Sequence, residues 1–182
     1  MGNREDKILN HGYRVALLAK ELGKTIGLSE KEIEHIYITG LNHDIGKQYL
    51  DIKILNKKGV LTEREKIYIK MHVLLSTSTA IEKKMDVYIV KGISHHHENF
   101  DGTGYPYNLK GNEIPIQSRI LRIVDEYDNL MMDTFFGKGL RKQKAIKTMD
   151  KDIHKFDQDI YLEFKKMIDN YDIYSSELKA VN

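Results

Sequence analysis

Helical spacing of apolar residues runs through most of this chain of 182 residues and constrains the possible fold more than any other feature. The first such segment predicts a helix from about residue 4 to 26. Its inner face carries His11, Val15, Leu18 and Leu22. No segment has the alternating apolar and polar pattern that is typical of a half-buried strand. Because the length suits one domain with a buried core, we expect an all-α helical bundle.

Capping signals predict where later helices begin. Ser29–Glu32 and Thr62–Glu65 each have the form of a capping box, in which a hydroxyl and a carboxylate bind the first free amides of a helix. The helix that starts at the second box is expected to run through His72, which would lie near its C-terminal part. Asp86 is expected to cap another helix, and apolar spacing carries that helix to His97.

The helical pattern is interrupted where both prolines of the chain occur. Asp101–Pro106 contains two glycines, and Pro115 follows shortly, so this stretch is interpreted as an ordered loop. Helical spacing then resumes, with Asp125 and Asp128 on neighbouring parts of one face. The remaining helices are expected at residues 116–132, 140–149 and 157–171. Residues 1–172 are interpreted as one domain, and residues 173–182 as a C-terminal tail or short helix.

The chain has eight histidines and no cysteine. Without cysteine, disulfides, thiolate zinc sites, iron–sulfur clusters and cysteine nucleophiles are excluded together. Any metal must therefore be bound by nitrogen and oxygen atoms. The histidines are also unevenly distributed, since His95, His96 and His97 are consecutive and His43 directly precedes Asp44.

Charge and hydropathy exclude further classes of protein. With 29 basic and 27 acidic residues, the formal net charge is +2, which is too small to indicate a nucleic acid polymer as partner. No apolar run reaches the length of a membrane span, and no signal-peptide pattern is present, so we expect a cytoplasmic location. The segment Gly137–Met149, which includes Lys138, carries five cations and no anion. This segment is either a solvated helix face or a funnel for an anionic substrate.

The dipeptide His43–Asp44 indicates a metal site rather than ordinary core packing. Lys47 follows within one turn, and burying an imidazole, a carboxylate and an ammonium group without partners would be costly. A divalent metal supplies such partners, and a helical bundle can hold it in its middle. The further candidate ligands come from other helices and are His11, His72, His96 and His97. Consecutive helical residues point about 100° apart, so the last two converge only where a helix end lets both lean the same way.

These residues belong to longer motifs, and the chain resembles the HD-GYP subgroup of the HD-domain metal-dependent phosphohydrolases from His11 to about Phe164. The motifs that carry the resemblance are Leu41–Lys47, Lys70–His72, His96–Pro106, Lys110–Pro115, Arg119–Asp125, Tyr127–Asp128 and Phe156–Asp157. The resemblance implies an HD-domain helical bundle with an ordered GYP loop. It also implies hydrolysis of cyclic di-GMP to the linear dinucleotide, to GMP or to both.

The resemblance further implies roles for individual residues. One metal ion would be held by His11, His43, Asp44 and Asp125. Asp44 would bridge to a second ion held by His72, His96 and His97. Both ions would be divalent, with iron or manganese the expected elements. A hydroxide that bridges the two ions would attack phosphorus, and Lys47 would face the scissile phosphate. Asp101, Gly104 and Tyr105 would shape the wall and lip of the site and contact substrate.

The chain departs from the HD-GYP pattern at two positions. Members with three metals carry a glutamate where this chain has Lys7, so we hypothesise that it binds two. The arginine expected to hold substrate is replaced by Thr134, and Lys138 is a candidate to compensate.

Alternative functions stay open at this level. One is hydrolysis of another phosphoester, such as cyclic GMP-AMP or a nucleotide, and another is a sensor that binds the dinucleotide without hydrolysing it. A sensory domain, fused or separate, is a further expected partner.

Overall fold

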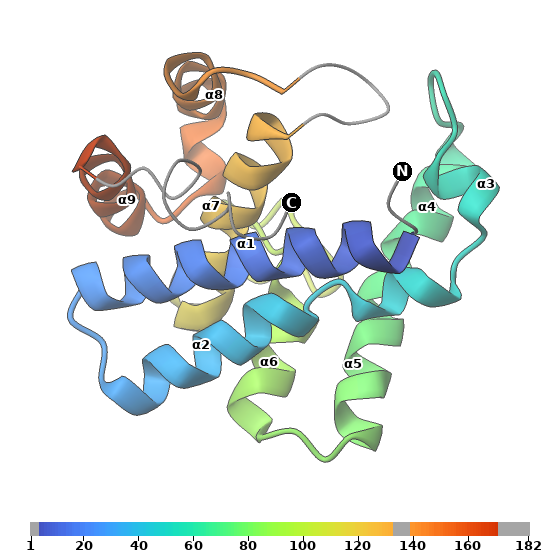
Figure 1. The fold of residues 1–182 in the computed structure, drawn as a ribbon, viewed down its shortest axis with the longest axis horizontal. Coiled ribbons are helices and arrows are strands. Elements are labelled where there is room, and N and C mark those ends of the chain that lie inside the picture. Colours follow the sequence, from blue (N-terminus) through green and yellow to red (C-terminus); the bar gives the residue numbers. More distant parts are fainter. Residues whose placement is uncertain (1–3, 133–138, 171–182) are drawn as a thin grey trace.

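The computed structural model describes residues 4–132 and 139–170, with side chains from residue 8 onward. Within these ranges the chain is helical and has no strand, which confirms the expected all-α fold (Figure 1). The α-helices are α1 (Arg4–Thr25), α2 (Glu30–Asn42), α3 (Ile52–Leu55), α4 (Glu63–Lys70), α5 (His72–Glu82), α6 (Val87–His95), α7 (Ile116–Met131), α8 (Lys142–Met149) and α9 (Gln158–Asn170). Short 3-10 helices lie at η1 (Ile45–Tyr49), η2 (Gly111–Glu113) and η3 (Asp150–Lys155).

The predicted helix starts at residues 29, 62 and 86 are confirmed. At α2, the Glu32 N–H donates to Ser29 Oγ and the Ser29 N–H donates to the Glu32 carboxylate at 2.9 Å. Thr62 and Glu65 make the same reciprocal pair at α4. Asp86 accepts from the N–H of the second residue of α6 at 2.8 Å. Each cap satisfies amides that have no partner inside the helix.

The expected helix through His72 is wrong in one respect, because it divides at Met71 into α4 and α5. Met71 keeps helical backbone angles (φ −61°, ψ −19°), but its N–H binds the Tyr68 carbonyl three residues earlier, which tightens the turn. His72 is therefore the first residue of α5 rather than near the end of its helix. No proline or glycine marks this division, and burial of His72 and Val73 accompanies it.

The second difference concerns α6, which ends at His95 rather than His97. The Glu98 N–H binds the His95 carbonyl, and the Tyr105 N–H binds the His97 carbonyl. These bonds to the following loop turn the chain away from the helix axis. As a result, the rings of His96 and His97 lie with their centroids only 4.1 Å apart. The end of α6 thus lets the side chains of His96 and His97 converge, as binding to one metal ion would require.

The hydrophobic core lies where α1, α7 and α9 pack together, with α8 against α7 (Figure 1). The inner face predicted for α1 is confirmed, since Val15, Leu18 and Leu22 are fully buried. Aromatic rings fill the part of the core between α7 and α9, where the Tyr127 and Phe164 centroids are 5.1 Å apart in an edge-to-face arrangement. This core holds α1 and α7 side by side and so fixes the distance between His11 and Asp125.

α1 and α2 cross closely because a glycine lies at the crossing. A Cβ atom built on Gly40 would lie 2.6 Å from the Ala16 Cα, so no larger residue fits. Gly12 on α1 is similarly close, with a Cβ 2.8 Å from the Leu41 carbonyl oxygen. The close approach carries His11 of α1 next to the end of α2, where His43 follows.

Replacing Gly40 by alanine is expected to destabilise the protein by roughly 1–3 kcal/mol, because the added methyl group overlaps the α1 backbone. Urea unfolding followed by circular dichroism measures this change. Gly23→Ala in α1 is the matched control, because a Cβ placed there lies at ordinary van der Waals distance, 3.5 Å, from its nearest atom. Equal stability of Gly40→Ala and wild type would show that the helices can move apart freely.

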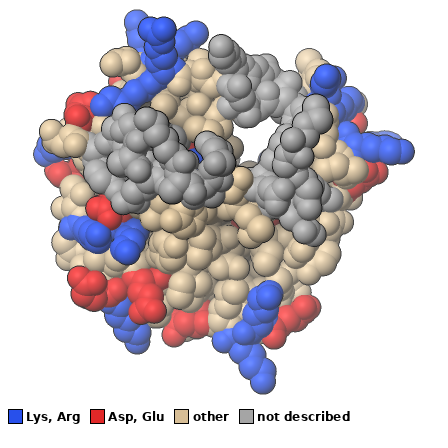
Figure 2. Space-filling view, viewed as in Figure 1, with Lys and Arg blue, Asp and Glu red and all other residues tan. Residues whose placement is uncertain are grey.

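Charges are interspersed over the described part of the surface seen in Figure 2, where Lys and Arg lie beside Asp and Glu. This agrees with the small net charge of +2. In the part of the chain that the structure describes, no helix is both long and apolar enough to cross a membrane.

Candidate metal centre

Three histidines of the site are held by backbone carbonyl groups that lie close to them in the chain. The Nδ1 atom of each lies within hydrogen-bonding distance of a carbonyl oxygen three residues earlier. The pairs are His43 with Gly40 at 2.7 Å, His72 with Ile69 at 2.7 Å and His96 with Ile93 at 2.6 Å. Because a carbonyl only accepts, Nδ1 must carry the proton, and Nε2 is left with a free lone pair. Such tethering fixes both the tautomer and the direction of a metal-binding imidazole.

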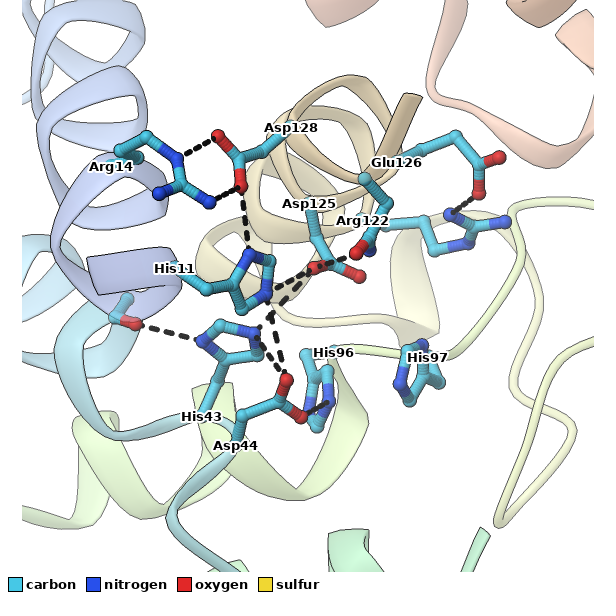
Figure 3. Close-up of polar contacts among 12 residues, drawn as sticks. His11, Arg14, His43, Asp44, His96, His97, Arg122, Asp125, Glu126 and Asp128 are labelled. Atoms are coloured by element: carbon cyan, nitrogen blue, oxygen red, sulfur yellow. Dashed lines mark hydrogen bonds and ion pairs between the residues drawn. The ribbon is translucent and has the colours of Figure 1, made fainter. Parts of the chain in front are cut away.

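Asp44 lies between two groups of imidazoles and turns one oxygen toward each. Its Oδ2 lies 3.5 Å from Nε2 of His11 and 3.5 Å from Nε2 of His43. Its Oδ1 lies 3.3 Å from Nε2 of His72 and 4.0 Å from Nε2 of His96. The carboxylate is buried at the junction of α2 and η1. Its two oxygens are thus arranged as in a carboxylate that bridges two cations (Figure 3).

The structure brings the seven predicted ligands into two adjoining groups. Within each group, one ligand atom per residue lies within 4.8 Å of the others. The first group is His11, His43 and Asp125, and the second is Asp44, His72, His96 and His97. In the first, His11 Nε2 lies 3.1 Å from Asp125 Oδ1. In the second, His72 Nε2 lies 3.2 Å from His97 Nε2.

The packing of η1 on α5 explains why Asp44 meets His72. The Gly46 N–H donates to Ser76 Oγ at 2.8 Å. A Cβ atom on Gly46 would lie 2.3 Å from the His72 carbonyl oxygen, so only glycine lets the two backbones touch. The glycine that follows the His43–Asp44 pair therefore brings the second histidine group within reach of Asp44.

Buried polar atoms without a hydrogen-bond partner test whether these residues fit a metal. Among the described residues, Nε2 of His11, Nε2 of His43 and Oδ1 of Asp44 are such atoms, and all three point into the cluster. Leaving them unpaired in a protein interior would be costly. Imidazole nitrogen and carboxylate oxygen are common metal ligands, so the donor set fits a divalent cation.

The carboxylates of the cluster are held in their charged form. Burial alone would raise the pKa of Asp44 and Asp125. For Asp44, the Lys47 ammonium and the nearby histidines outweigh burial and hold the pKa well below its usual range. For Asp125, the adjacent His11 and His43 side chains outweigh burial in the same way and hold the pKa well below its usual range. Both oxygens of each group therefore remain available as anionic donors.

His11 differs in charge from the imidazoles of the second group. In the second group, burial lowers the pKa of His72, His96 and His97, to about 3 for His96, so these rings are neutral donors. Burial also lowers the pKa of His11, but Asp125 and Asp128 outweigh it and raise the value to about 9. The first group thus favours a positive charge, which a proton supplies until a metal ion displaces it.

His11 is oriented by a buried ion pair that the sequence did not assign. Its Nδ1 lies 2.8 Å from Asp128 Oδ2, and Arg14 donates to both Asp128 oxygens at 2.7 and 2.9 Å (Figure 3). Asp128 is fully buried, whereas the Arg14 side chain is 16% exposed. The signal was available, because Asp128 follows Asp125 by three residues on one helix face.

Lys47 lies against the bridging carboxylate. Its ammonium group contacts Asp44 Oδ2, and its side chain remains 27% exposed. Burial lowers the pKa of Lys47, but Asp44 and Asp125 outweigh burial and raise it, so the group stays charged. Lys47 is therefore a cation at the edge of the cluster that solvent and a ligand can reach.

The GYP loop covers the second group through Tyr105. The Tyr105 ring stacks on His97 with centroids 4.9 Å apart, and the Lys70 ammonium lies 4.7 Å from its centroid. Gly104 is needed for packing, since a Cβ there would lie 2.2 Å from the Asn99 nitrogen. Glu98, which the sequence did not single out, anchors the loop by accepting from two backbone N–H groups, at 2.7 and 3.1 Å.

Asp101 is directed toward its own loop. It accepts from the Thr103 N–H at 2.9 Å and the Thr103 hydroxyl at 2.7 Å, and it lies 3.7 Å from His154 Nε2. These contacts shape the loop that carries Tyr105 rather than reaching the cluster.

Three sequence predictions fall outside the described residues. Thr134 and Lys138 lie in the undescribed segment 133–138, and the side chain of Lys7 precedes the described side chains. The tail 173–182 is likewise undescribed. Of the basic segment, Lys142 is directed toward α9, where it donates to the Ile168 carbonyl at 2.8 Å and lies 3.2 Å from Asp169.

Comparison with known proteins identifies relatives that match most of this chain. A family model described as HD domain matches residues 2–160. A cyclic di-GMP phosphodiesterase of Pseudomonas aeruginosa is 30% identical over 164 residues, which are 90% of this chain and 40% of that protein. A 3'3'-cGAMP-specific phosphodiesterase of Vibrio cholerae is 38% identical over 120 residues, which are 66% of this chain and 28% of that protein. The chain thus spans less than half the length of these curated relatives.

Among solved structures, a HDG"Y"P protein from Bdellovibrio bacteriovorus has a TM-score of 0.76 with 21% sequence identity. The match covers 93% of this chain and 55% of that protein. At this identity the likeness concerns the fold, and it extends over nearly all the helices described above.

Proposed function

The chain belongs to the HD domain family, and we propose that it is a metal-dependent phosphodiesterase that hydrolyses cyclic dinucleotides. Two divalent ions would occupy the two side-chain groups described above, with Asp44 shared between them. Iron and manganese are the proposed elements, because imidazole and carboxylate ligands suit both. The proposed number is two, since Lys7 stands where a third metal would need a carboxylate.

The observation that carries this proposal is the position of Asp44. One carboxylate has an oxygen 3.5 Å from two imidazoles of the first group and the other oxygen 3.3 Å from the second group. A structural ion pair needs only one partner for a carboxylate. Here, imidazole nitrogens face one buried carboxylate from both sides, and this arrangement supports a dinuclear centre.

The proposed roles of the protein residues are to orient the metal ligands and to bind the substrate phosphate. When bound, two divalent cations lower the pKa of water and offset the charge of phosphate oxygens. His11 is oriented by Asp128, while His43, His72 and His96 are oriented by backbone carbonyls, so the donor atoms need little rearrangement. The Lys47 ammonium would bind a phosphate oxygen and hold the diester in line for attack by water.

Cyclic di-GMP is the first proposed substrate, with cyclic GMP-AMP as the alternative. The name of the Pseudomonas aeruginosa relative supports the former, over 90% of this chain. The alternative is favoured by the higher identity of the Vibrio cholerae relative, 38% over 120 residues. The product would be the linear dinucleotide, GMP or both. We also propose that residues 1–172 form one catalytic domain that acts in the cytoplasm beside a sensory domain.

One assay tests the function and the substrate together. Metal-loaded protein is incubated with cyclic di-GMP, cyclic GMP-AMP and a generic aryl phosphodiester, and the products are resolved by chromatography. We expect a cyclic dinucleotide to be cleaved in preference to the aryl diester. Binding of the dinucleotides without any product would instead indicate a sensor.

Replacing Lys47 by methionine is expected to lower kcat about 10²- to 10³-fold, because a cation that stabilises the transition state is lost. Metal content should be unchanged, since the seven proposed ligands remain. Lys53→Met, at an exposed position in α3, is the matched control and should retain activity. A kcat equal to wild type in Lys47→Met would remove this residue from the mechanism.

A further inference from the structure

Among the histidines of the proposed metal centre, His97 differs in how its ring is oriented. The others each have a partner at Nδ1, which is a carboxylate for His11 and a backbone carbonyl for His43, His72 and His96. Within the described part of the chain, His97 has no hydrogen bond at Nδ1, and its Nε2 lies 3.2 Å from His72 Nε2. Because such partners fix the direction of a metal-binding imidazole, the His97 ring needs another constraint.

The loop of residues 96–106 supplies a constraint on His97. The Tyr105 N–H donates to the His97 carbonyl at 3.2 Å, so the loop folds back on its own beginning. The Tyr105 ring also stacks on the His97 imidazole, with centroids 4.9 Å apart. The direction of the His97 ring therefore depends on where this loop lies.

Arg122 joins the loop to α7. Its Nε donates to Asn99 Oδ1 at 2.8 Å, and Asn99 Nδ2 donates to Thr103 Oγ1 at 3.0 Å. The Asn99 amide thus connects the guanidinium with both sides of the loop, two residues after His97. Burial raises the pKa of Tyr105 and the Arg122 charge opposes this shift, which places that charge near the Tyr105 hydroxyl.

Two further contacts fix the Arg122 guanidinium itself. Its Nη1 donates to Glu126 Oε2 at 2.8 Å (Figure 3), and its carbon lies 5.3 Å from the centroid of the buried Phe156 ring. The Arg122 side chain is only 12% exposed. Its neighbours Leu121 and Ile123 are fully buried, so α7 cannot shift without disturbing the core. Arg122 therefore links the loop to a fixed part of the molecule.

From these contacts we propose that Arg122 is a positioning residue for His97 and thereby for the second metal ion. The inference rests on the proposed function, because it requires a dinuclear centre. The hydrogen bond to Asn99 holds the loop, and the loop holds the His97 ring through Tyr105. The remaining histidines have their own partners at Nδ1, so loss of Arg122 acts on the metal centre through His97.

Replacing Arg122 by methionine is expected to weaken binding of the second ion about 10- to 100-fold, the usual effect of losing an orienting partner, and to leave the first ion unchanged. Methionine keeps an apolar stem beside Phe156 but has no N–H to donate. Stepwise titration with manganese measures both affinities. Electron paramagnetic resonance at two equivalents of manganese separates the species, because two ions that share a carboxylate are magnetically coupled. Wild-type affinity for the second ion in Arg122→Met would overturn the proposal.

Variants of the two partners of Arg122 show whether the effect passes through Asn99. Asn99→Ala is expected to act like Arg122→Met, whereas Asn99→Asp keeps an accepting oxygen and should bind both ions. Glu126→Gln is the matched control, since the bond between Arg122 and Asn99 remains, and it should bind both ions as wild type does. The double variant of Arg122→Met and Asn99→Ala should be no weaker than either single variant, because both break one bond. Additive losses would contradict a path through Asn99.

Hydrogen exchange of the metal-free protein tests the same link without metal or substrate. In Arg122→Met the Tyr105 amide is expected to exchange about tenfold faster or more, because loss of a hydrogen bond from a charged donor favours local opening of the loop. The Tyr161 amide, which binds the Asp157 carbonyl at the start of α9, is the control and should be unchanged. Unchanged exchange at Tyr105 would overturn the proposal. Failure of the proposed function differs from this, because it appears in wild type as two bound ions without turnover.

Discussion

Replacing Asp44 by alanine is expected to abolish hydrolysis and to remove both proposed metal ions. The carboxylate lies between the two sets of imidazoles, with its oxygens 3.5 and 3.3 Å from Nε2 of His11 and of His72. Its loss removes both the shared ligand and the ion pair between Asp44 and Lys47. Losing a metal centre forfeits several kcal/mol of transition-state stabilisation, which corresponds to roughly 10³-fold or more in kcat/KM.

The variant is compared with wild type by turnover of cyclic di-GMP and by elemental analysis of the same samples. Asp152→Ala is the matched control, because this carboxylate is 52% exposed on η3 and, within the described part of the chain, forms an ion pair with Lys155 alone. The control should keep its metal and its activity. Substantial turnover by Asp44→Ala would contradict a shared carboxylate at the centre of the mechanism.

Replacing Asp128 by asparagine is expected to lower the free energy of unfolding by about 3 kcal/mol, because it leaves the charge of Arg14 beside a neutral amide in the interior. Asp128 is fully buried and bonds Arg14 through both oxygens at 2.7 and 2.9 Å. The same substitution loosens His11, whose Nδ1 lies 2.8 Å from this carboxylate. Loss of such an orienting partner typically weakens metal affinity by about 10- to 100-fold.

Urea unfolding and metal titration measure the two effects separately. Glu126→Gln is the matched control, since Glu126 also pairs with an arginine on a helix surface but is 37% exposed. An i, i+4 pair whose carboxylate is exposed in this way contributes at most about 1 kcal/mol, so the control should remain close to wild type. If Asp128→Asn retained wild-type stability and metal affinity, the buried pair would have no positioning role.

The helices and the identity of the clustered side chains could be predicted from local sequence. The capping boxes at Ser29 and Thr62 consist of hydrogen bonds between residues three positions apart, so the local sequence predicts them. The apolar face of α1 is predicted by the helical spacing of its apolar residues. The seven proposed ligands were found because they occur in ordered motifs. In the structure these side chains form two groups around Asp44.

The remaining features depend on contacts between segments distant in sequence. The division at Met71 places His72 at the start of α5, although neither glycine nor proline marks this division. The first residues of α5 are buried, and the helix packs against η1. The early end of α6 depends on hydrogen bonds to the GYP loop. Asp128 acquires its role from Arg14, which lies 114 positions earlier in the chain. The local spacing of Asp125 and Asp128 places both on one helix face, but it does not reveal the contact with Arg14.

The number of metal ions bound per chain tests the central claim most directly. Wild-type protein is loaded with manganese or iron, freed of excess metal and measured by elemental analysis against protein concentration. Two ions per chain are expected, one for each side-chain group that adjoins Asp44. One ion would contradict the sharing of Asp44 between two sites, and three would contradict the inference drawn from Lys7.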